Sequence, residues 1–272
     1  MTDTLRRKFA EYYVECKIHP QHFACPHQDF CRQFAHRRDM TETKMSMVGR
    51  HYGEHFPRIV VLSLDPPSGN RGAYVEPHQR TTECISERHE NDDYSATRPN
   101  NPHWAMTQII VKDILCWFGY VAQPGVAVVK ESYAGRPIEN VSAFFAHVNV
   151  AKCSMNNPGK GQAHRKVHVK CADSYLAGEL KILAPDILIT QGNAANEITA
   201  RLLNAERFSP SDLPCARKID LEGITTLWLP MRHPARQLAN IRLEWPQYVT
   251  AIHEHAIDNR LGNMFDLTTL VW

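Results

Sequence analysis

The sequence lacks long apolar runs. None approaches the roughly 20 residues of a membrane-spanning helix, and the densest stretch, Ile59 to Leu64, suits a buried strand. The amino-terminal residues include basic side chains but no apolar segment of the kind found in secretory signals. Internal repeats and low-complexity tracts are missing too. These absences argue against a membrane or secreted protein, and we expect a cytoplasmic location.

Net charge is also small, at +2 from 31 Lys and Arg and 29 Asp and Glu residues. This value neither requires nor excludes a nucleic-acid partner, but the distribution of charge is uneven. Residues 230–243 carry three arginines and no acid. Residues 152–172 carry no acid and five basic side chains, which are Lys152, Lys160, Arg165, Lys166 and Lys170. Such segments are typical of phosphate binding, although solvated surface explains them equally well.

The remaining composition is that of a globular protein, with 43% hydrophobic and 22% charged residues over 272 positions. Four apolar runs predict buried strands, at Arg58–Leu64, His147–Ala151, Asp186–Thr190 and Thr225–Leu229. Helical patterns cover Thr4–Val14, Ala105–Phe118, Val169–Leu183, Ala194–Leu203 and Gln237–His255, the last interrupted near Pro246.

Alternation of strands and helices predicts a three-layer α/β/α fold around a central four-stranded, mostly parallel sheet. We interpret residues 1–272 as a single domain, in which residues 1–40 form a helix and a cysteine-rich segment. Residues 68–101 form a long polar insertion soon after the first strand. Because open α/β sheets bind ligands at the carboxyl ends of their strands, we expect this insertion to belong to an active site.

Eight cysteines are present, which are Cys16, Cys25, Cys31, Cys84, Cys116, Cys153, Cys171 and Cys215. In a reducing compartment, clustered cysteines indicate a metal or cofactor more often than disulfides. The spacing of Cys16, Cys25 and Cys31 nearly matches a zinc finger completed by His36. Structural zinc is therefore one interpretation of this segment.

Polar residues stand at the ends of three predicted strands. The first strand ends in SLDPPS at residues 63–68, where Asp65 is fixed by two prolines. The second contains Asn149, followed by Lys152 and Cys153, and the last ends before the His233-Pro234 pair. Taken singly, each is an ordinary turn, cap or buried polar residue.

Taken together, these elements resemble the iron–sulfur branch of the uracil-DNA glycosylase superfamily. The resemblance rests on the ordered set of a strand ending in a proline turn, Asn149 with Lys152-Cys153, Cys171, the sequence LAPDILITQGNA at residues 183–194, and HPA at residues 233–235. It extends from about Arg58 to Arg236. It implies a glycosylase fold and a monofunctional DNA glycosylase that flips a pyrimidine out of the duplex.

The resemblance also implies roles for single residues. Asp65 stands where glycosylases with a Gly-Gln-Asp-Pro-Tyr motif keep their catalytic aspartate, although the iron–sulfur branch usually has a small residue there. Asn149 matches the asparagine that reads the base, and His233 the histidine that donates to the pyrimidine O2. The substrate pocket is expected to include Ser63, Leu64, Pro67 and, stacking on the base, Trp104.

Four cysteines match the cluster ligands of the family. Cys153 and Cys171 correspond to the later pair, and Cys31 with Cys25 to the earlier pair, with Cys16 as the alternative to Cys25. We therefore expect a structural [4Fe–4S] cluster, which accounts for cysteines that a zinc finger leaves unexplained. The expected contacts to double-stranded DNA are Lys160, Arg165 and Lys166, with Arg236 and Gln237 where the family intercalates.

The base itself is left open by Asn149, whose amide matches either uracil or cytosine. Pro67 stands where uracil-specific enzymes carry a tyrosine that blocks substituents at C5. We therefore favour a C5-modified cytosine of phage DNA, and hence antiviral defence by a monomer, over uracil repair. A non-catalytic nucleic-acid-binding protein that contains zinc or a cluster is the remaining alternative.

Overall fold

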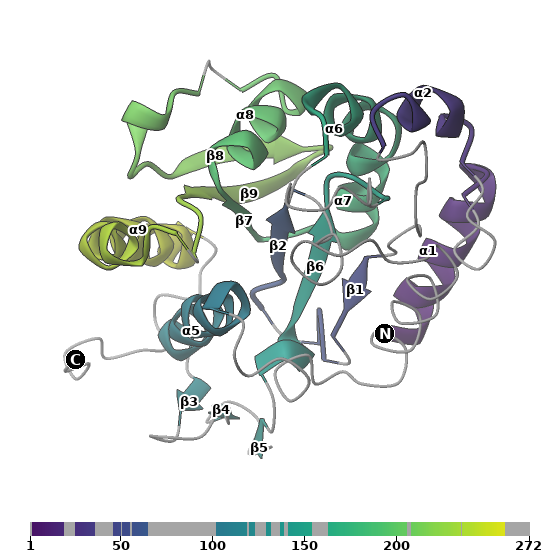
Figure 1. Cartoon of the computed structure of the whole chain (residues 1–272). Helices are drawn as coiled ribbons and strands as arrows, with labels where there is room; N and C mark the ends of the chain where they lie inside the picture. Colours follow the sequence, from purple (N-terminus) through teal and green to yellow (C-terminus); the bar gives the residue numbers. More distant parts are fainter. Residues whose placement is uncertain are drawn as a thin grey trace.

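The computed structural model describes residues 2–18, 25–35, 46–49, 51–54, 56–64, 102–118, 120–122, 129–131, 137–138, 141–153, 163–205, 208–234 and 236–258. Their centre is a six-stranded sheet in the order β1-β6-β2-β7-β9-β8 (Figure 1). The strands are β1 Met47–Val48, β2 Ile59–Ser63, β6 Phe145–Asn149, β7 Ile187–Gln191, β8 Arg217–Leu221 and β9 Ile224–Met231. The inner four run parallel, and the two edge strands are antiparallel to their neighbours.

The four parallel strands are the four apolar runs of the sequence, each displaced by no more than about two residues at either end. Every side chain of β2, β6 and β7 is buried. A strand covered by helices on both faces needs apolar residues at successive positions, which is why these segments read as continuous runs. The prediction of a mostly parallel α/β sheet is confirmed.

The predicted number of four strands is too small, because two edge strands escaped the sequence pattern. β8 alternates half-buried and exposed side chains and includes two basic residues and an acid. β1 has only two residues, too few for any pattern. A separate three-stranded sheet consists of β3 Tyr120–Ala122, β4 Val129–Glu131 and β5 Pro137–Ile138. Edge strands need no apolar run, since one side of each faces no neighbouring strand.

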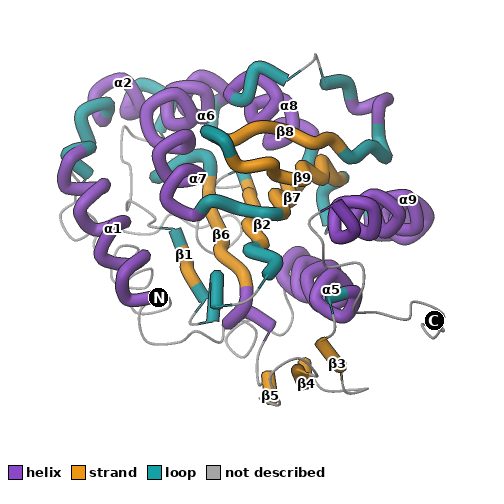
Figure 2. Tube along the Cα trace, turned by 180° about the vertical axis from the view of Figure 1, so that it is seen from behind, coloured by secondary structure: helices purple, strands orange, loops and turns teal. Residues whose placement is uncertain are grey.

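Helices cover both faces of the large sheet (Figure 2). One face carries α1 Thr2–Glu15, α2 Gln28–Arg32, α6 Arg165–Cys171, the π-helical turn η3 Ala172–Leu176, α7 Ala177–Leu183 and α8 Asn193–Leu202. The other carries α5 Pro102–Trp117, the 3-10 turn η2 Val141–Phe144 and α9 Leu238–Asp258. A further 3-10 turn, η4, spans Pro210–Asp212. Within these described helices, none combines the length and apolar character needed to cross a membrane.

Helix α9 is continuous, and the predicted interruption near Pro246 is wrong. A proline inside a helix removes one backbone hydrogen bond, to the carbonyl four residues earlier. Here Pro246 and Arg242 are both exposed, so water can satisfy that carbonyl. On the opposite side of the helix, Ile241, Trp245 and Tyr248 are buried against the sheet and hold the helix in place.

Strand alternation determines which side chains reach the site. Ile59 and Val61 of β2 lie in the core beneath α5 and α9, so Ser63, two residues further, points to the same face. By the same period Asn149 follows Phe145, and Gln191 follows Ile187 and Ile189. Three polar side chains therefore end three adjacent strands on one face of the sheet.

The opposite ends of β2 and β7 are joined by an ion pair. The Arg58 guanidinium donates from Nε to Asp186 Oδ2 at 3.0 Å and from a terminal nitrogen to Oδ1 at 2.8 Å. The backbone N–H of Arg58 also donates to Asp186 Oδ2, at 2.7 Å. This contact fixes the register at the amino ends of the strands, far along them from Ser63 and Gln191.

Candidate active site

Polar side chains from four elements meet at the carboxyl ends of the parallel strands. Ser63 of β2 is paired in register with Asn149 of β6, and both side chains are buried. The Ser63 hydroxyl lies 3.3 Å from Gln191 Oε1 at the end of β7. His103, in the first turn of α5, approaches Ser63 Oγ with Nε2 at 3.4 Å, and its ring centroid lies 5.1 Å from that of His233. This is the edge at which open α/β sheets bind ligands.

The hydrogen bonds around Ser63 can run in only one direction. The Gln191 amide donates to Thr107 Oγ1 at 2.8 Å, and Thr107 donates to the His103 carbonyl at 2.8 Å. Gln191 therefore presents its carbonyl oxygen to Ser63, which must donate its single proton to it. Both imidazoles near Ser63 must then donate to it, His147 Nε2 at 2.9 Å and His103 Nε2 at 3.4 Å.

This directionality decides the chemistry open to Ser63. A serine nucleophile needs a histidine that accepts its proton. Ser63 instead gives its proton to Gln191 and accepts from His147 and His103. The four-residue arrangement is therefore a support that joins α5 to the strand ends, and not a hydrolytic dyad.

His233 follows β9 and faces the same region. Its side chain is half-buried, and Nδ1 has no hydrogen-bond partner among the described residues. Burial, and next the charge of Arg236, lower the pKa of His233 below its usual range. A neutral imidazole with an uncommitted buried nitrogen is suited to bind a polar atom of a ligand.

Gly192 lets the chain pass beside that histidine. It connects β7 to α8 with φ of +98°, a conformation that favours glycine. A Cβ at Gly192 would lie 3.6 Å from both Cβ and Cδ2 of His233. Its N–H donates to the Met231 carbonyl at 2.9 Å, which ties the turn after β7 to the end of β9. The glycine in residues 183–194 thus shapes the wall beside His233.

His103 should make the stability of the protein depend on pH in the acid range. Burial, and next the charge of His233, lower the pKa of His103 to about 4. Between pH 6.5 and 4 His103 is protonated in the unfolded chain but stays neutral in the folded protein. We therefore expect the free energy of unfolding to fall as pH decreases through this window, by up to about 3 kcal/mol. Urea unfolding at pH 7 and pH 4.5 measures this, and His103→Asn should reduce the difference. His253→Asn, on α9, is the control; an equal reduction there would contradict the assignment.

Several predicted site residues cannot be placed. Asp65, Pro67 and Lys160 lie outside the described residues, as does the insertion at 68–101. Trp104 lies in the first turn of α5, and its side chain is outside the described part. Leu64 is buried, and its carbonyl accepts from the Ala151 N–H at 2.9 Å. Leu64, the last described residue before Asp65 in the sequence, therefore lies at the edge that carries Ser63 and Asn149.

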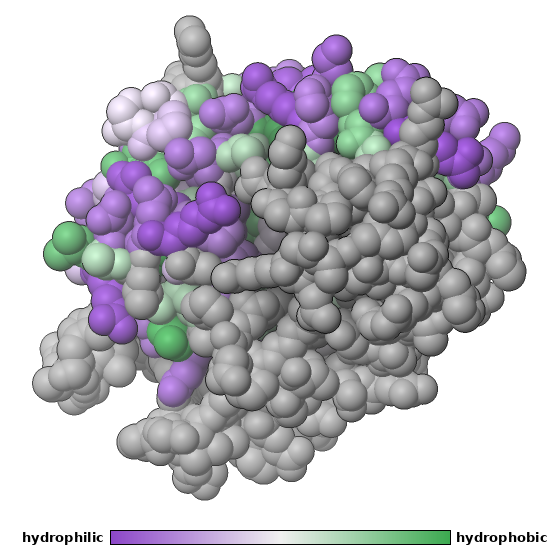
Figure 3. Space-filling view, viewed as in Figure 1, coloured by the Kyte–Doolittle hydropathy of each residue, from purple (hydrophilic) through white to green (hydrophobic). Residues whose placement is uncertain are grey.

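Basic side chains predicted to contact DNA are exposed. Arg165 and Lys166 lie in the first turn of α6, and Arg165 makes a 3.3 Å ion pair with Glu197 of α8. Arg236 is exposed and Gln237 half-buried, and both backbone N–H groups donate to the His233 carbonyl. Hydrophilic residues predominate on the face formed by α2, α6 and α8 (Figure 3).

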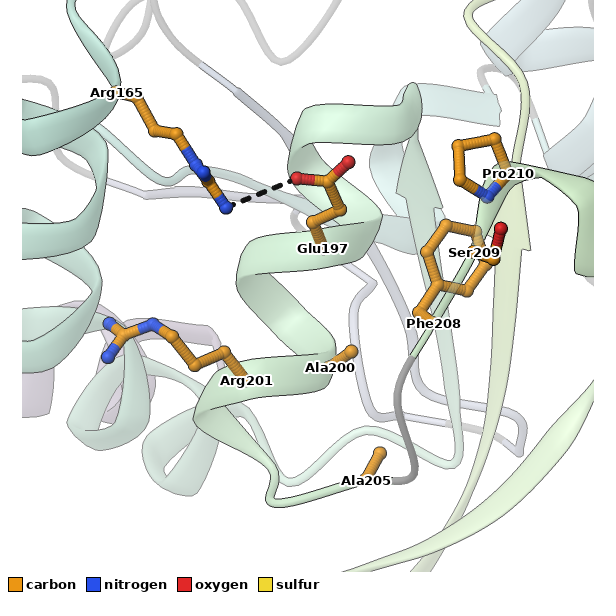
Figure 4. Close-up of a pocket in the computed structure, with 8 residues that line it drawn as sticks. All are labelled: Arg165, Glu197, Ala200, Arg201, Ala205, Phe208, Ser209 and Pro210. Atoms are coloured by element: carbon orange, nitrogen blue, oxygen red, sulfur yellow. Dashed lines mark hydrogen bonds and ion pairs between the residues drawn. The ribbon is translucent and has the colours of Figure 1, made fainter.

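A cavity of about 440 Å³ lies beside this surface (Figure 4). Its lining residues are Arg165, Glu197, Ala200, Arg201, Ala205, Phe208, Ser209 and Pro210. None of them belongs to the polar group at the strand ends. Both arginines are already paired, Arg165 with Glu197 and Arg201 with Asp173. The cavity therefore offers little free charge, and the strand ends remain the better candidate site.

Four cysteines from distant parts of the chain gather on the other face of the sheet. Cys31, Cys153 and Cys171 are buried in one apolar core, and Cys25 packs against it. A hydrogen bond with Cys31, and burial, raise the pKa of Cys153, and burial raises the pKa of Cys171 to about 12. Within the described residues, no three His, Cys, Asp or Glu side chains form a group that could hold a metal ion. The thiols are neighbours, then, without all pointing at one centre.

The surroundings of Cys25 and Cys16 differ. Cys25 Sγ lies 3.2 Å from the Tyr175 hydroxyl, which the π-helical turn after Cys171 directs towards it. Cys16, directly after α1, instead interacts with Tyr12 of that helix, and burial raises the pKa of the Cys16 thiol. Both Cys16 and Cys25 pack against the core that holds the other three thiols, and Cys25 interacts with Cys153 and Cys171.

No protein-family model matches the sequence. No curated protein matches it at a significant level either.

Proposed function

We propose that this protein is a monofunctional DNA glycosylase that hydrolyses the N-glycosidic bond of a flipped pyrimidine. The observation that carries the proposal is that Asn149 and His233 both lie at the carboxyl ends of the parallel strands, Asn149 paired with Ser63 and His233 beside His103. Asp65 follows Ser63 by two residues in the sequence. These are the residue types that the reaction needs, and they come from strands far apart in sequence.

The chemistry asks for two kinds of stabilisation. Breaking the bond leaves a cation-like sugar and an anionic base. A carboxylate such as that of Asp65 stabilises the sugar and positions water, and a donor aimed at the pyrimidine O2 stabilises the base. His233 supplies that donor in its neutral form, which its lowered pKa maintains near neutral pH. No lysine is needed for hydrolysis, so an abasic site is the product.

Asn149 reads the base edge through an amide that donates and accepts at once. The Ser63–Gln191–Thr107 hydrogen bonds keep the neighbouring wall rigid. The substrate class follows from sequence: Pro67 lacks the tyrosine ring that blocks C5, and residues 68–101 offer polar side chains for a larger pocket. The proposed natural substrate is therefore a C5-modified cytosine of phage DNA.

We also propose that Cys25, Cys31, Cys153 and Cys171 hold a [4Fe–4S] cluster. Thiols are the usual ligands of such a cluster, and the four side chains would have to turn towards one centre to hold it. A finger built on Cys16, Cys25 and Cys31 would leave out Cys153, although its thiol is hydrogen-bonded to that of Cys31. The role would be structural, joining residues 25–35 to the sheet.

The test is mass spectrometry of bases released from two DNAs, one containing uracil and one from a phage with glucosylated hydroxymethylcytosine. Release of the modified cytosine, absent with Asp65→Asn, is the expected result. Release of uracil alone would make the protein a repair glycosylase. If neither base is released and the DNA is still bound, the protein is a binding module and the proposal fails.

A further inference from the structure

The strand end that carries Asn149 is held by a buried ion pair. Lys152 Nζ lies 2.5 Å from Glu179 Oε2, and the two side chains are 3% and 0% exposed. Burying two charges is costly, and a well-packed apolar pair of similar size is often as stable or more so. We therefore expect this ion pair to have a role other than stabilising the fold.

Glu179 is fully engaged on its other oxygen. Oε1 accepts hydrogen bonds from the Tyr13 hydroxyl of α1 and, at 3.1 Å, from Ser46 Oγ before β1. The Ser46 N–H in turn donates to the Tyr13 hydroxyl at 3.1 Å. The carboxylate is thus fixed by two separate elements, and it can hold the ammonium of Lys152 in one position.

Lys152 makes its second hydrogen bond to Asn149. Its Nζ donates to the backbone carbonyl of Asn149 at 2.5 Å. On the β2 side, the N–H groups of Val150 and Ala151 donate to the Ser63 and Leu64 carbonyls, both at 2.9 Å. The backbone around Asn149 is therefore held by hydrogen bonds to β2 on one side and by the charge-assisted hydrogen bond from Lys152 on the other.

The same residue touches the cysteine group. The Lys152 backbone N–H donates to the Cys171 thiol, and Cys153 is its neighbour in the chain. Lys152 thus lies between the base-reading asparagine and the four thiols, with α1 reaching it through Tyr13 and Glu179.

We propose that Lys152, held by Glu179, is a positioning residue that fixes the backbone of Asn149 for base recognition. The inference rests on the proposed function in giving Asn149 that role. A backbone clamp of this kind acts on the rate of the chemical step, because a misplacement of about 1 Å can cost 100-fold in rate. It leaves duplex binding by the basic surface unaffected.

The test uses the double variant Lys152→Met/Glu179→Gln in the full-length protein. Each single variant leaves one buried charge without its partner and is expected to fold poorly. The double variant has no charge at these two positions, and Glu179→Gln keeps an acceptor for Tyr13 and Ser46. We expect single-turnover base release to fall about 10- to 100-fold, with DNA affinity and thermal midpoint close to wild type. The matched control is Arg58→Met/Asp186→Asn, which removes the pair at the other end of the sheet and should leave the rate unchanged.

Hydrogen exchange separates this inference from the proposed function. In the double variant the Val150 and Ala151 amides should exchange at least about 10-fold faster than in wild type, with other β2 and β7 amides unchanged. A wild-type protein that releases no base refutes the proposed function, yet the exchange result still decides whether Lys152 fixes this segment. A folded double variant with wild-type rate and exchange would overturn the positioning role.

Discussion

His233→Ala is expected to lower the single-turnover rate of base release about 100- to 1,000-fold, with little change in DNA affinity. The reason is that the hydrogen bond from His233 matters chiefly when negative charge builds on the departing base. Removing one such preorganised donor in an enzyme costs a factor of this size. His233 has the attributes of that donor: a half-buried ring, a buried nitrogen without a described partner, and a lowered pKa.

The pH profile of the same reaction gives a second reading. Because burial and Arg236 lower the pKa of His233, the neutral form prevails at pH 7, and the rate should hold constant there and fall only in acid. His253→Ala, on α9, removes a histidine away from the strand ends and should keep the wild-type rate. A His233→Ala enzyme that retains its rate would place the donor elsewhere, with His103 as the next candidate because its ring adjoins that of His233.

The apolar pattern predicts the inner sheet because those strands are buried on both faces. The apolar composition of runs such as Ile59–Ser63 and Ile187–Gln191 shows that they are buried. β8 fails the same pattern, since its Arg217, Lys218 and Asp220 suit an edge. A strand with only one buried face alternates apolar and polar residues. A search for continuous apolar runs therefore does not find it.

The site divides in a similar way. Asn149 and His233 can be found from sequence because each stands in a motif at the end of an apolar run. His147, Gln191 and Thr107 were missed, although a polar residue at the end of an apolar strand is a usable signal. Their partners could not have been named, since the hydrogen bonds join four elements that meet only in the folded chain.

Glu179 is the clearest missed signal. It falls within the apolar stripe of its helix, with Leu176, Leu180 and Leu183 at helical spacing. An acid in such a stripe needs a buried partner. Only the fold identifies that partner as Lys152, which the sequence suggested as one of several basic residues for phosphate contact.

Cys171→Ser is expected to remove iron from the purified protein and to destabilise it by more than about 4 kcal/mol, the range reached when a structural metal is lost. The physical reason lies in the connections. Cys25 and Cys31 belong to residues 25–35, whereas Cys153 lies four residues after the end of β6 and Cys171 ends α6. Without a shared group the four thiols are linked only by packing, which stabilises residues 25–35 far less.

Two other cysteines provide matched controls. Cys16 interacts with Tyr12, and Cys215 lies on the segment before β8 with its thiol near Arg217. Cys16→Ser and Cys215→Ser should both keep the cluster, with about four iron and four sulfide per chain. Proteolysis gives an independent readout: in Cys171→Ser, cleavage should begin within residues 25–35, while both controls resist it.

The outcomes rank the ligand sets directly. Loss of iron in Cys16→Ser but not in Cys25→Ser would exchange those two residues in the ligand set. A colourless wild-type protein with one zinc per chain, retained in Cys153→Ser, would establish the finger of Cys16, Cys25 and Cys31 instead. The Cys153 thiol is hydrogen-bonded to that of Cys31, and the adjacent Lys152 donates from Nζ to the Asn149 carbonyl. Cluster loss should therefore also reduce base release. A Cys171→Ser protein with full activity and no iron would separate the cluster from the reaction.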